Sequence, residues 1–302
     1  MDRNQKLFTD YNDVFADIMN VLLYGGKRVI KEDDLENSKD ISQYKADGKL
    51  HEQERDVSKY LKGQEYRVAF LGMEHQNKMD QYMPLRVISY DGSAYRSQLL
   101  DNNKINLYPV ITLVLYFGNE RWKYGKSLYE VLNISDELKE FTNDYKINLI
   151  EVAYLSEKQI EMFQSDFRFL ADFFRQKREK GSYTPLKGKI KHLDEFIKFL
   201  SVAANDDRYL EYLDIINEDL DRTEGYDMCE VLDFYINKGI EKGKQLEHTA
   251  MENEIRKAES ALIKEKTARE KEKAAREKAE AARIAAERRI IELEKELELL
   301  RG

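Results

Sequence analysis

Apolar residues recur every three or four positions near the start of the chain, between residues 12 and 24. This spacing places them on one face of a helix, so we predict a helix over residues 12–24. Asn12 or Asp13 is expected to cap its start. Gly25 and Gly26 are expected to end it. The apolar positions are Val14, Phe15, Ile18, Met19, Leu22 and Leu23.

The next part of the chain has strand patterns. We predict a short strand over residues 27–30, a polar loop over 31–50, and two longer strands over 54–61 and 66–76. Roughly four residues separate the two longer strands, which is a typical length for a hairpin loop. These two strands are therefore expected to pair antiparallel.

A helix and two further strands follow the hairpin. Residues 80–100 are predicted to be helical, with Pro84 in the first turn, where its missing N–H costs little. Residues 108–117 are almost continuously apolar and β-branched, which predicts a buried strand, and 146–155 predicts a final strand. A hairpin joined through a helix to further strands implies a mixed sheet and an α/β fold.

The rest of the first 245 residues is predicted to be helical. Helical spacing of apolar residues extends over 157–180, 192–204 and 206–242, with a break around Pro185. We therefore expect three parts in the chain. They are an α/β core over 1–155, a helical region over 156–245 and a charged helical tail over 246–302.

The tail is dominated by Ala, Glu, Lys and Arg, which favour a long helix. On a seven-residue frame the last two heptads have an apolar seam, whereas Arg269, Arg276 and Arg283 occupy the seam in the middle. Two interpretations stay open. The tail is either a single solvated helix held by pairs of charges one turn apart, or a coiled coil that forms a homo-oligomer through residues 290–300.

Composition excludes several classes of protein. The 302 residues are 42% hydrophobic, and their single cysteine, Cys229, allows no intramolecular disulfide. The first residues hold no apolar core of signal-peptide length, and the longest apolar run, around 110–117, is too short to cross a membrane. We therefore expect a cytoplasmic protein that does not associate with membranes.

Charge is distributed unevenly along the chain, whose net charge is −8. From Thr249 onward there are 14 basic and 13 acidic residues, so the preceding part has 36 basic and 45 acidic residues. An acidic body argues against indiscriminate binding of nucleic acid. It does not exclude a metal site, because carboxylates hold Mg²⁺.

The candidate chemistry lies in the hairpin. Asp56 and Glu74 are symmetric about its turn, so a regular register places them opposite one another on the same face. Two adjacent carboxylates repel unless something positive lies between them, and a divalent cation is one such partner. The carbonyl oxygen of His75 is a candidate third ligand. The alternative is a solvated acidic face paired with Lys or Arg. Because the neighbouring strand is apolar on both faces, an unpartnered carboxylate there is costly.

Three short motifs stand out together: Arg55-Asp56-Val57, Glu74-His75-Gln76-Asn77-Lys78-Met79, and Met83-Pro84-Leu85-Arg86 with Tyr90 four residues later. In combination they are similar to the PD-(D/E)XK nuclease superfamily, and within it to the Rpn-type recombination-promoting nucleases/putative transposases. The resemblance covers about residues 8–245 and implies an αβββαβ core.

The resemblance also implies roles for individual residues. Asp56, Glu74 and the His75 carbonyl would bind Mg²⁺ (or Mn²⁺), and Asp56, Glu74 and Gln76 would be catalytic. Gln76 stands where the superfamily usually has a lysine. Glutamine can hydrogen-bond a water but carries no charge. Lys59 and Lys78 are candidates for a replacement cation.

Arg86 and Tyr90 lie one helical turn apart and are candidates for substrate binding. A packing contact or a salt bridge to the sheet is the alternative for both. Asp13 is either an acidic group of the site or a plain helix cap. The resulting hypothesis is a Mg²⁺-dependent DNA endonuclease. The alternative is a weak or inactive relative that binds DNA or oligomerises through its tail.

Overall fold

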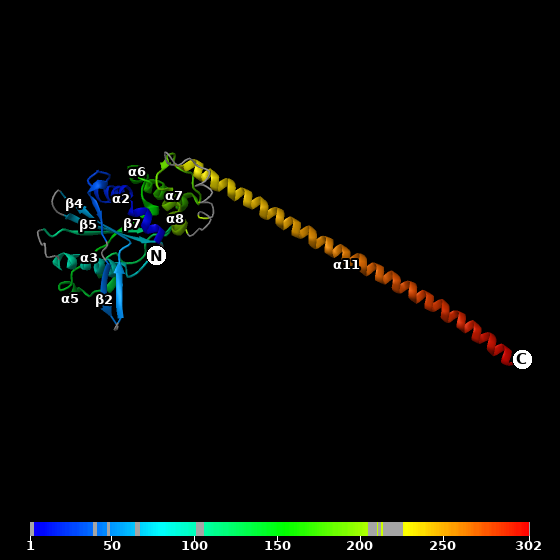
Figure 1. Ribbon diagram of the computed structural model, residues 1–302. Helices are drawn as coiled ribbons and strands as arrows, with labels where there is room; N and C mark the ends of the chain where they lie inside the picture. The colour runs from blue at the N-terminus through cyan, green and yellow to red at the C-terminus, as the bar shows by residue number, and fades with distance from the viewer. Residues whose placement is uncertain are drawn as a thin grey trace. The chain divides into compact units, whose positions relative to one another are not determined.

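The structure is a computed structural model of the chain (Figure 1). It describes residues 3–38, 41–46, 49–63, 67–100, 106–204, 210, 213 and 226–301. The chain forms two compact units, Met1–Tyr235 and Ile236–Gly302, and each is described here by itself.

A five-stranded sheet forms the centre of the first unit (Figure 1). The strand order is β1-β4-β5-β6-β7. β1, β4 and β5 pair antiparallel, whereas β5, β6 and β7 pair parallel. The predicted mixed sheet is therefore confirmed. Its strands are β1 (Leu35–Asn37), β4 (Val57–Lys62), β5 (Arg67–Gln76), β6 (Val110–Tyr116) and β7 (Asn148–Glu151).

Helices pack on both faces of this sheet (Figure 1). The largest core cluster joins one face to α1 (Arg3–Asp10), α2 (Asn12–Tyr24), α7 (Phe167–Lys180) and α8 (Leu193–Ala204). The other face packs on α3 (Met83–Leu100) through two smaller clusters. The central strand β6 is apolar on both faces because both faces are covered.

Alternate residues of β5 enter opposite clusters. Leu71 and Met73 belong to the large cluster, which also contains residues of α7 and α8. Phe70 packs with Ala94 of α3 on the other side. The helices after residue 155 therefore complete the same core as the sheet.

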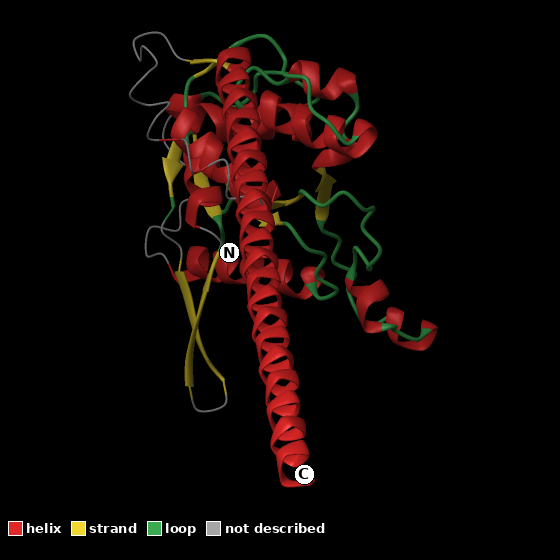
Figure 2. Cartoon of the chain, turned by 90° about the vertical axis from the view of Figure 1, so that its right-hand side faces the viewer, coloured by secondary structure: helices red, strands yellow, loops and turns green. Residues whose placement is uncertain are grey.

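The remaining elements are short. β2 and β3 pair antiparallel as a separate two-stranded ribbon that projects from the sheet (Figure 2), and β8 pairs with β9. These elements are η1 (Glu32–Asp34), β2 (Ile41–Ala46), β3 (Lys49–Glu54), α4 (Leu128–Leu132), α5 (Asp136–Lys139), η2 (Val152–Tyr154), α6 (Glu157–Met162), β8 (Lys189–Ile190) and β9 (Tyr226–Asp227).

The predicted strand over residues 27–30 is wrong. The chain there is a loop, held by the buried amide of Asn20, whose Oδ1 accepts from the N–H groups of Val29 at 3.0 Å and Ile30 at 2.8 Å. The strand forms later, as β1, where Leu35 pairs with Leu61. The predicted loop over 31–50 also contains β1, β2 and the start of β3.

The helix predicted over residues 12–24 is confirmed as α2, but its predicted cap is wrong. The N-cap is Tyr11, with no side-chain cap, while the Asn12 amide donates to the carbonyl oxygen of Glu32 at 3.0 Å. At the other end Gly25 has a φ of 62°, a left-handed conformation that suits glycine.

The later predictions hold for element type more than for length. α3 starts at Met83 with Pro84 in its first turn, and β6 is buried as predicted. β7 is shorter than the predicted 146–155, since η2 follows Glu151.

The prediction of a single helix over 157–180 is wrong, because the chain forms two helices there, α6 and α7. The break is stabilised by Asp17, which accepts from two backbone N–H groups, those of Gln164 and Ser165, at 2.8 Å each.

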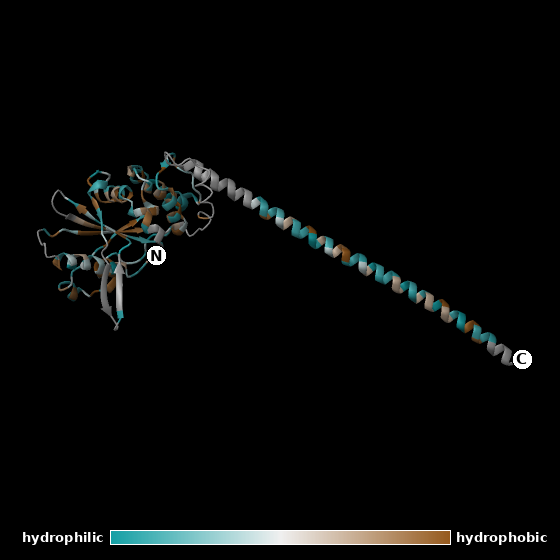
Figure 3. Ribbon diagram, in the orientation of Figure 1, coloured by the Kyte–Doolittle hydropathy of each residue, from teal (hydrophilic) through white to brown (hydrophobic). Residues whose placement is uncertain are grey.

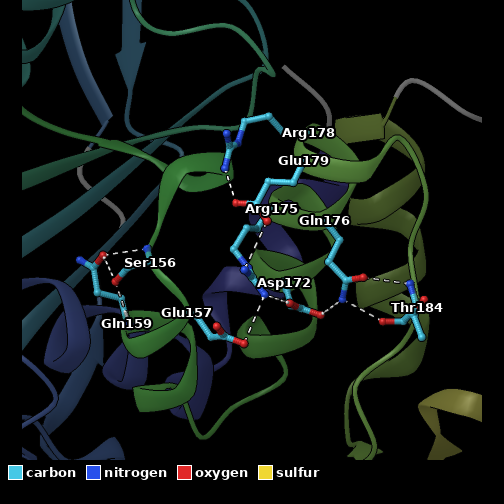
Figure 4. Close-up of polar contacts among 9 residues, drawn as sticks. All are labelled: Ser156, Glu157, Gln159, Asp172, Arg175, Gln176, Arg178, Glu179 and Thr184. Carbon is cyan, nitrogen blue, oxygen red and sulfur yellow. Dashed lines mark hydrogen bonds and ion pairs between the residues drawn. The ribbon is translucent and has the colours of Figure 1, made fainter.

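Polar contacts fix α7 to its neighbours (Figure 4). Arg175 Nη2 lies 3.4 Å from Asp172 Oδ1 on the same helix and 3.8 Å from Glu157 Oε1 at the start of α6. Gln176 donates to the carbonyl oxygen of Thr184 at 2.9 Å and accepts from the Thr184 N–H at 3.1 Å. The segment after α7 is therefore held against the helix.

The second unit lies within one long helix, α11 (Met228–Arg301). Side chains from 243 to 295 are exposed, and the residues of this part of the helix are mostly hydrophilic (Figure 3). Glu265 pairs with Arg269 at 2.8 Å, and Glu272 pairs with Arg276 at 2.7 Å. The predicted helical tail is confirmed.

Part of the predicted helix over 206–242 lies outside the described residues, which resume at Tyr226. The all-helical prediction for 156–245 is wrong at β8 and β9. Of the helices within the described ranges, none is both long and apolar enough to cross a membrane.

Candidate functional site

The β4–β5 hairpin has the register that its sequence predicts. Val57 pairs with Met73 and Ser58 with Gly72. Extending this register by one residue places Asp56, just before β4, opposite Glu74 near the end of β5. The structure therefore brings these two predicted carboxylates together at one end of the hairpin.

Asp56 is a buried carboxylate with several donors around it. Its side chain is 7% exposed, and its Oδ2 accepts from the His75 N–H at 2.8 Å. His75 Nδ1 lies 3.6 Å from Oδ2, and Lys6 Nζ lies 3.7 Å from Oδ1. Burial raises the pKa of Asp56, but the contacts with His75 and the charge of Lys6 outweigh it, so the pKa is lowered. Asp56 is thus ionised.

The pKa of Glu74 shifts in the opposite direction, upward. Its side chain is 1% exposed, and its nearest polar contacts are 3.4 Å long, from the Asp56 N–H to Oε1 and from Arg86 Nη2 to Oε2. Burial and the charge of Asp56 raise the pKa of Glu74 to about 8. The site therefore holds one readily ionised carboxylate beside one that resists ionisation.

Arg86 and Tyr90 extend from α3 to this pair, as their spacing predicts. Arg86 Nη2 contacts Glu74 and donates to the Tyr90 hydroxyl at 3.3 Å, while Nη1 pairs with Asp80 at 3.0 Å. The Arg86 side chain is 39% exposed, so the guanidinium lies between the buried carboxylate and solvent. Burial and the charge of Glu74 raise the pKa of Tyr90.

Gln76 and His75 end β5 on opposite faces. Gln76 shares the face of Glu74 and is half-buried. Its carbonyl accepts from Phe117 N–H at 2.9 Å on the β6 side, so the His75 carbonyl points the other way, toward β4 and Asp56. On the opposite face the His75 ring contacts Thr9, with Nε2 3.0 Å from Oγ1.

The donor set consists of oxygen atoms. Among the described residues no group of three or more His, Cys, Asp and Glu side chains is arranged to hold a metal ion. What the site offers is the carboxylates of Asp56 and Glu74 and the inward-facing carbonyl of His75. Such a set fits Mg²⁺, which commonly keeps several waters and takes only one or two carboxylates from the protein.

The arginine of the Arg55-Asp56-Val57 motif is buried. Arg55 Nη2 pairs with Asp91 at 2.6 Å, and Asp91 also accepts from the hydroxyls of Thr112 at 2.7 Å and Tyr145. A Cβ at Gly72 would lie 2.8 Å from Arg55 Cδ. Arg55 thus fixes the chain next to Asp56, a role that the sequence did not suggest.

The other predicted candidates lie away from the carboxylates. Lys59 is fully buried, and its Nζ pairs with Asp10 at 2.8 Å. Asp13 pairs with His192 at 2.9 Å and with Lys191 at 2.8 Å. Neither residue is brought to Glu74. Lys78 is exposed on the loop after β5.

Sequence reasoning missed Lys6 and Thr9. Both are on α1, which has only two strongly apolar residues, Leu7 and Phe8, and therefore no periodic pattern. No signal in the sequence alone pointed to α1 as part of the site.

Comparison with protein families decides the identity of the chain. A family described as "Putative transposase, YhgA-like" matches residues 17–200, more than half of the chain. The chain belongs to the YhgA-like transposase family. The match spans both carboxylates and α3, and it begins after α1. No curated protein and no solved structure matches this member of the YhgA-like family.

Proposed function

We propose that this YhgA-like protein is a metal-dependent DNA endonuclease with a PD-(D/E)XK-like core. The observation that supports this most directly is the pairing of Asp56 and Glu74 at the end of the hairpin, next to Arg86. A buried pair of carboxylates beside an exposed arginine suits a metal ion and a phosphate.

The topology is consistent with the proposed core. Helix α2 is followed by β1, β4 and β5, which pair antiparallel, then by α3 and by β6, which is parallel to β5. This is the αβββαβ order that the sequence resemblance implies. The β2–β3 ribbon is an insertion between the first two of these strands.

Asp56, Glu74 and the His75 carbonyl would hold Mg²⁺ (or Mn²⁺). Bound there, the ion supplies Lewis-acid polarisation of a phosphate and lowers the pKa of a water. Glu74 resists ionisation because it is buried beside Asp56, and a positive ion favours its charged form.

Side chains of the protein bind the phosphate and orient the attacking water. Arg86 binds a phosphate oxygen, and Tyr90 holds the guanidinium in place through its hydroxyl. Gln76 orients the attacking water by hydrogen bonding. In the reaction a new P–O bond forms to the water oxygen and one P–O bond to a sugar breaks. The water proton ends on the leaving alkoxide, which gives a phosphomonoester and a hydroxyl.

Plasmid cleavage tests this function. Purified full-length protein is incubated with supercoiled plasmid and Mg²⁺, Mn²⁺ or EDTA, beside the Asp56→Ala and Glu74→Ala variants. Asp33→Ala, in the exposed η1, is the matched control. We expect metal-dependent nicking by wild type and the control and none by the two site variants. Cleavage that survives both substitutions, or no cleavage by wild type, would contradict the proposal.

A second candidate function rests on the tail. Ile290, Ile291 and Leu293 are exposed on α11, and Gln76 lacks the charge of the usual motif lysine. In this alternative the protein is a weak or inactive nuclease relative that binds DNA or joins a second copy through residues 290–300. Both candidates are for a cytoplasmic protein, with DNA as the partner of the nuclease and DNA or a second copy as the partner of the alternative. Light scattering on the full chain, with Ile290→Asp as the comparison, tests the homo-oligomer.

A further inference from the structure

Helix α1 places a lysine at the proposed site. Lys6 Nζ lies 3.7 Å from Asp56 Oδ1, and its side chain is 28% exposed. It thus touches the carboxylate while remaining in contact with solvent. The family match begins at residue 17, so Lys6 lies outside the matched segment.

The position of α1 is fixed by contacts on the same helical face as Lys6. Thr9 Oγ1 lies 3.0 Å from His75 Nε2, and Asp10 pairs with Lys59 of β4 at 2.8 Å. Residues three and four positions apart share one helical face, so Lys6, Thr9 and Asp10 all face the hairpin.

Packing on α8 holds α1 from the other side. The ring of Phe8 is fully buried and packs edge-on against Phe196 at 5.9 Å and Phe199 at 5.6 Å. α1 is therefore held between the sheet and α8, and the ammonium group of Lys6 is directed to one place at the end of the hairpin.

The site needs a cation that the motif does not supply. Gln76 is uncharged, Lys59 is buried against Asp10, and Arg86 lies on the Glu74 side of the site, where it pairs with Glu74 and Asp80. A DNA phosphate approaching Asp56 is repelled by the charge of this carboxylate unless a cation lies beside it. Lys6 is the lysine whose ammonium contacts that carboxylate.

We infer that Lys6 of α1 supplies the positive charge that the motif glutamine lacks, and that it binds a non-bridging oxygen of the scissile phosphate beside Asp56. This inference rests on the proposed nuclease function. It makes α1 and α8, which holds α1, part of the active site although neither contains a motif residue.

The test uses the full-length protein and two readouts, plasmid cleavage and Mn²⁺ binding by calorimetry. Lys6→Met removes the charge, Lys6→Arg keeps it, and Lys158→Met, on the exposed side of α6, is the matched control. We expect Lys6→Met to slow cleavage about 100-fold. We expect it also to tighten Mn²⁺ binding about two- to fivefold, because a cation beside Asp56 opposes the metal. Lys6→Arg and Lys158→Met should behave as wild type.

Adding Gln76→Lys to Lys6→Met distinguishes two roles of Lys6, supplying a positive charge to the site and holding α1 in place. If charge is what Lys6 provides, the double variant regains at least about tenfold of the lost rate. If Lys6 only holds α1 in place, cleavage and Mn²⁺ binding weaken together, the melting temperature falls, and Gln76→Lys restores nothing. That result would overturn the inference. Equal cleavage by wild type and Lys6→Met would also overturn it, but would leave the proposed nuclease function intact. If wild type does not cleave DNA, the proposed function fails first and this inference fails with it.

Discussion

Asp56 and Glu74 lie opposite each other in the register of one hairpin, with the Asp56 N–H 3.4 Å from Glu74 Oε1, yet their pKa values move in opposite directions. Asp56 accepts a backbone hydrogen bond and faces Lys6, which keeps it ionised. Glu74 is more deeply buried and is repelled by Asp56. One carboxylate therefore carries charge at neutral pH, while the other binds a proton until a cation replaces it.

This asymmetry predicts how stability depends on pH. The folded protein holds the Glu74 proton more tightly than the unfolded chain, with a pKa of about 8. The contribution of Glu74 to stability is therefore complete below its unfolded pKa and is lost as pH rises toward 8. Glu74→Gln removes this loss, on the order of 1 kcal/mol per pH unit over that window.

Urea unfolding of both proteins between pH 5 and 9, in EDTA, measures this difference. We expect the stability advantage of Glu74→Gln over wild type to grow with pH. Parallel curves for the two proteins would show that Glu74 ionises normally in the folded state.

Arg86 is expected to act on DNA cleavage more than on folding, since its side chain is 39% exposed. Arg86→Met should reduce kcat/KM for plasmid nicking about 10- to 100-fold. Arg86→Lys should recover little of this, because lysine cannot bind a phosphate through two parallel hydrogen bonds. Arg96→Met, exposed on the same helix, is the control. Equal losses for Arg86→Met and Arg96→Met would indicate a general effect of surface charge.

The sequence predicted the parts of the fold that local pattern determines. The symmetric spacing of Asp56 and Glu74 about the turn gave the observed register, because side chains alternate strictly along strands. The apolar run that became β6 and the one-turn spacing of Arg86 and Tyr90 were equally informative.

Features that depend on distant residues were missed. The break between α6 and α7 is held by Asp17, well over a hundred residues earlier in the chain. The β2–β3 ribbon mixes apolar and polar residues without regular alternation, as where Ser42 and Gln43 lie opposite Gln53 and Glu52, so no strand pattern marks it. Lys6 also escaped notice because it is brought to Asp56 by the packing of α1 on α8 and on β4, both distant in sequence.

Asp13 is expected to stabilise the first unit in a pH-dependent way. Burial raises its pKa, but hydrogen bonds from His192 and Lys191 outweigh burial and lower the pKa well below its usual value. Its contribution is therefore present above the unfolded pKa and is lost as pH falls through the folded one. Asp13→Asn should cost about 1 kcal/mol at pH 7 and progressively less below pH 4.

Thermal melts across this range test the expectation, with Asp33→Asn in the exposed η1 as the control. The melting temperature of Asp33→Asn should follow that of wild type at every pH. A deficit of Asp13→Asn that is the same at pH 3 and pH 7 would mean that the ionised carboxylate contributes nothing.

Two glycines provide a matched pair with opposite expected effects. A methyl group at Gly72 would lie 2.8 Å from Arg55 Cδ and 3.2 Å from Thr112 Oγ1, so Gly72→Ala should displace the buried arginine and cost about 1–3 kcal/mol. Gly92, in the middle of α3, has open space around its Cβ position. Gly92→Ala should instead stabilise the protein by about 0.5–1 kcal/mol, because alanine favours the helix. Denaturant unfolding of the two variants measures both changes in the free energy of unfolding.

Because Arg55 precedes Asp56, Gly72→Ala should also reduce plasmid cleavage, whereas Gly92→Ala should leave it unchanged. Equal stability of the two variants would mean that the Arg55–Asp91 pair tolerates displacement.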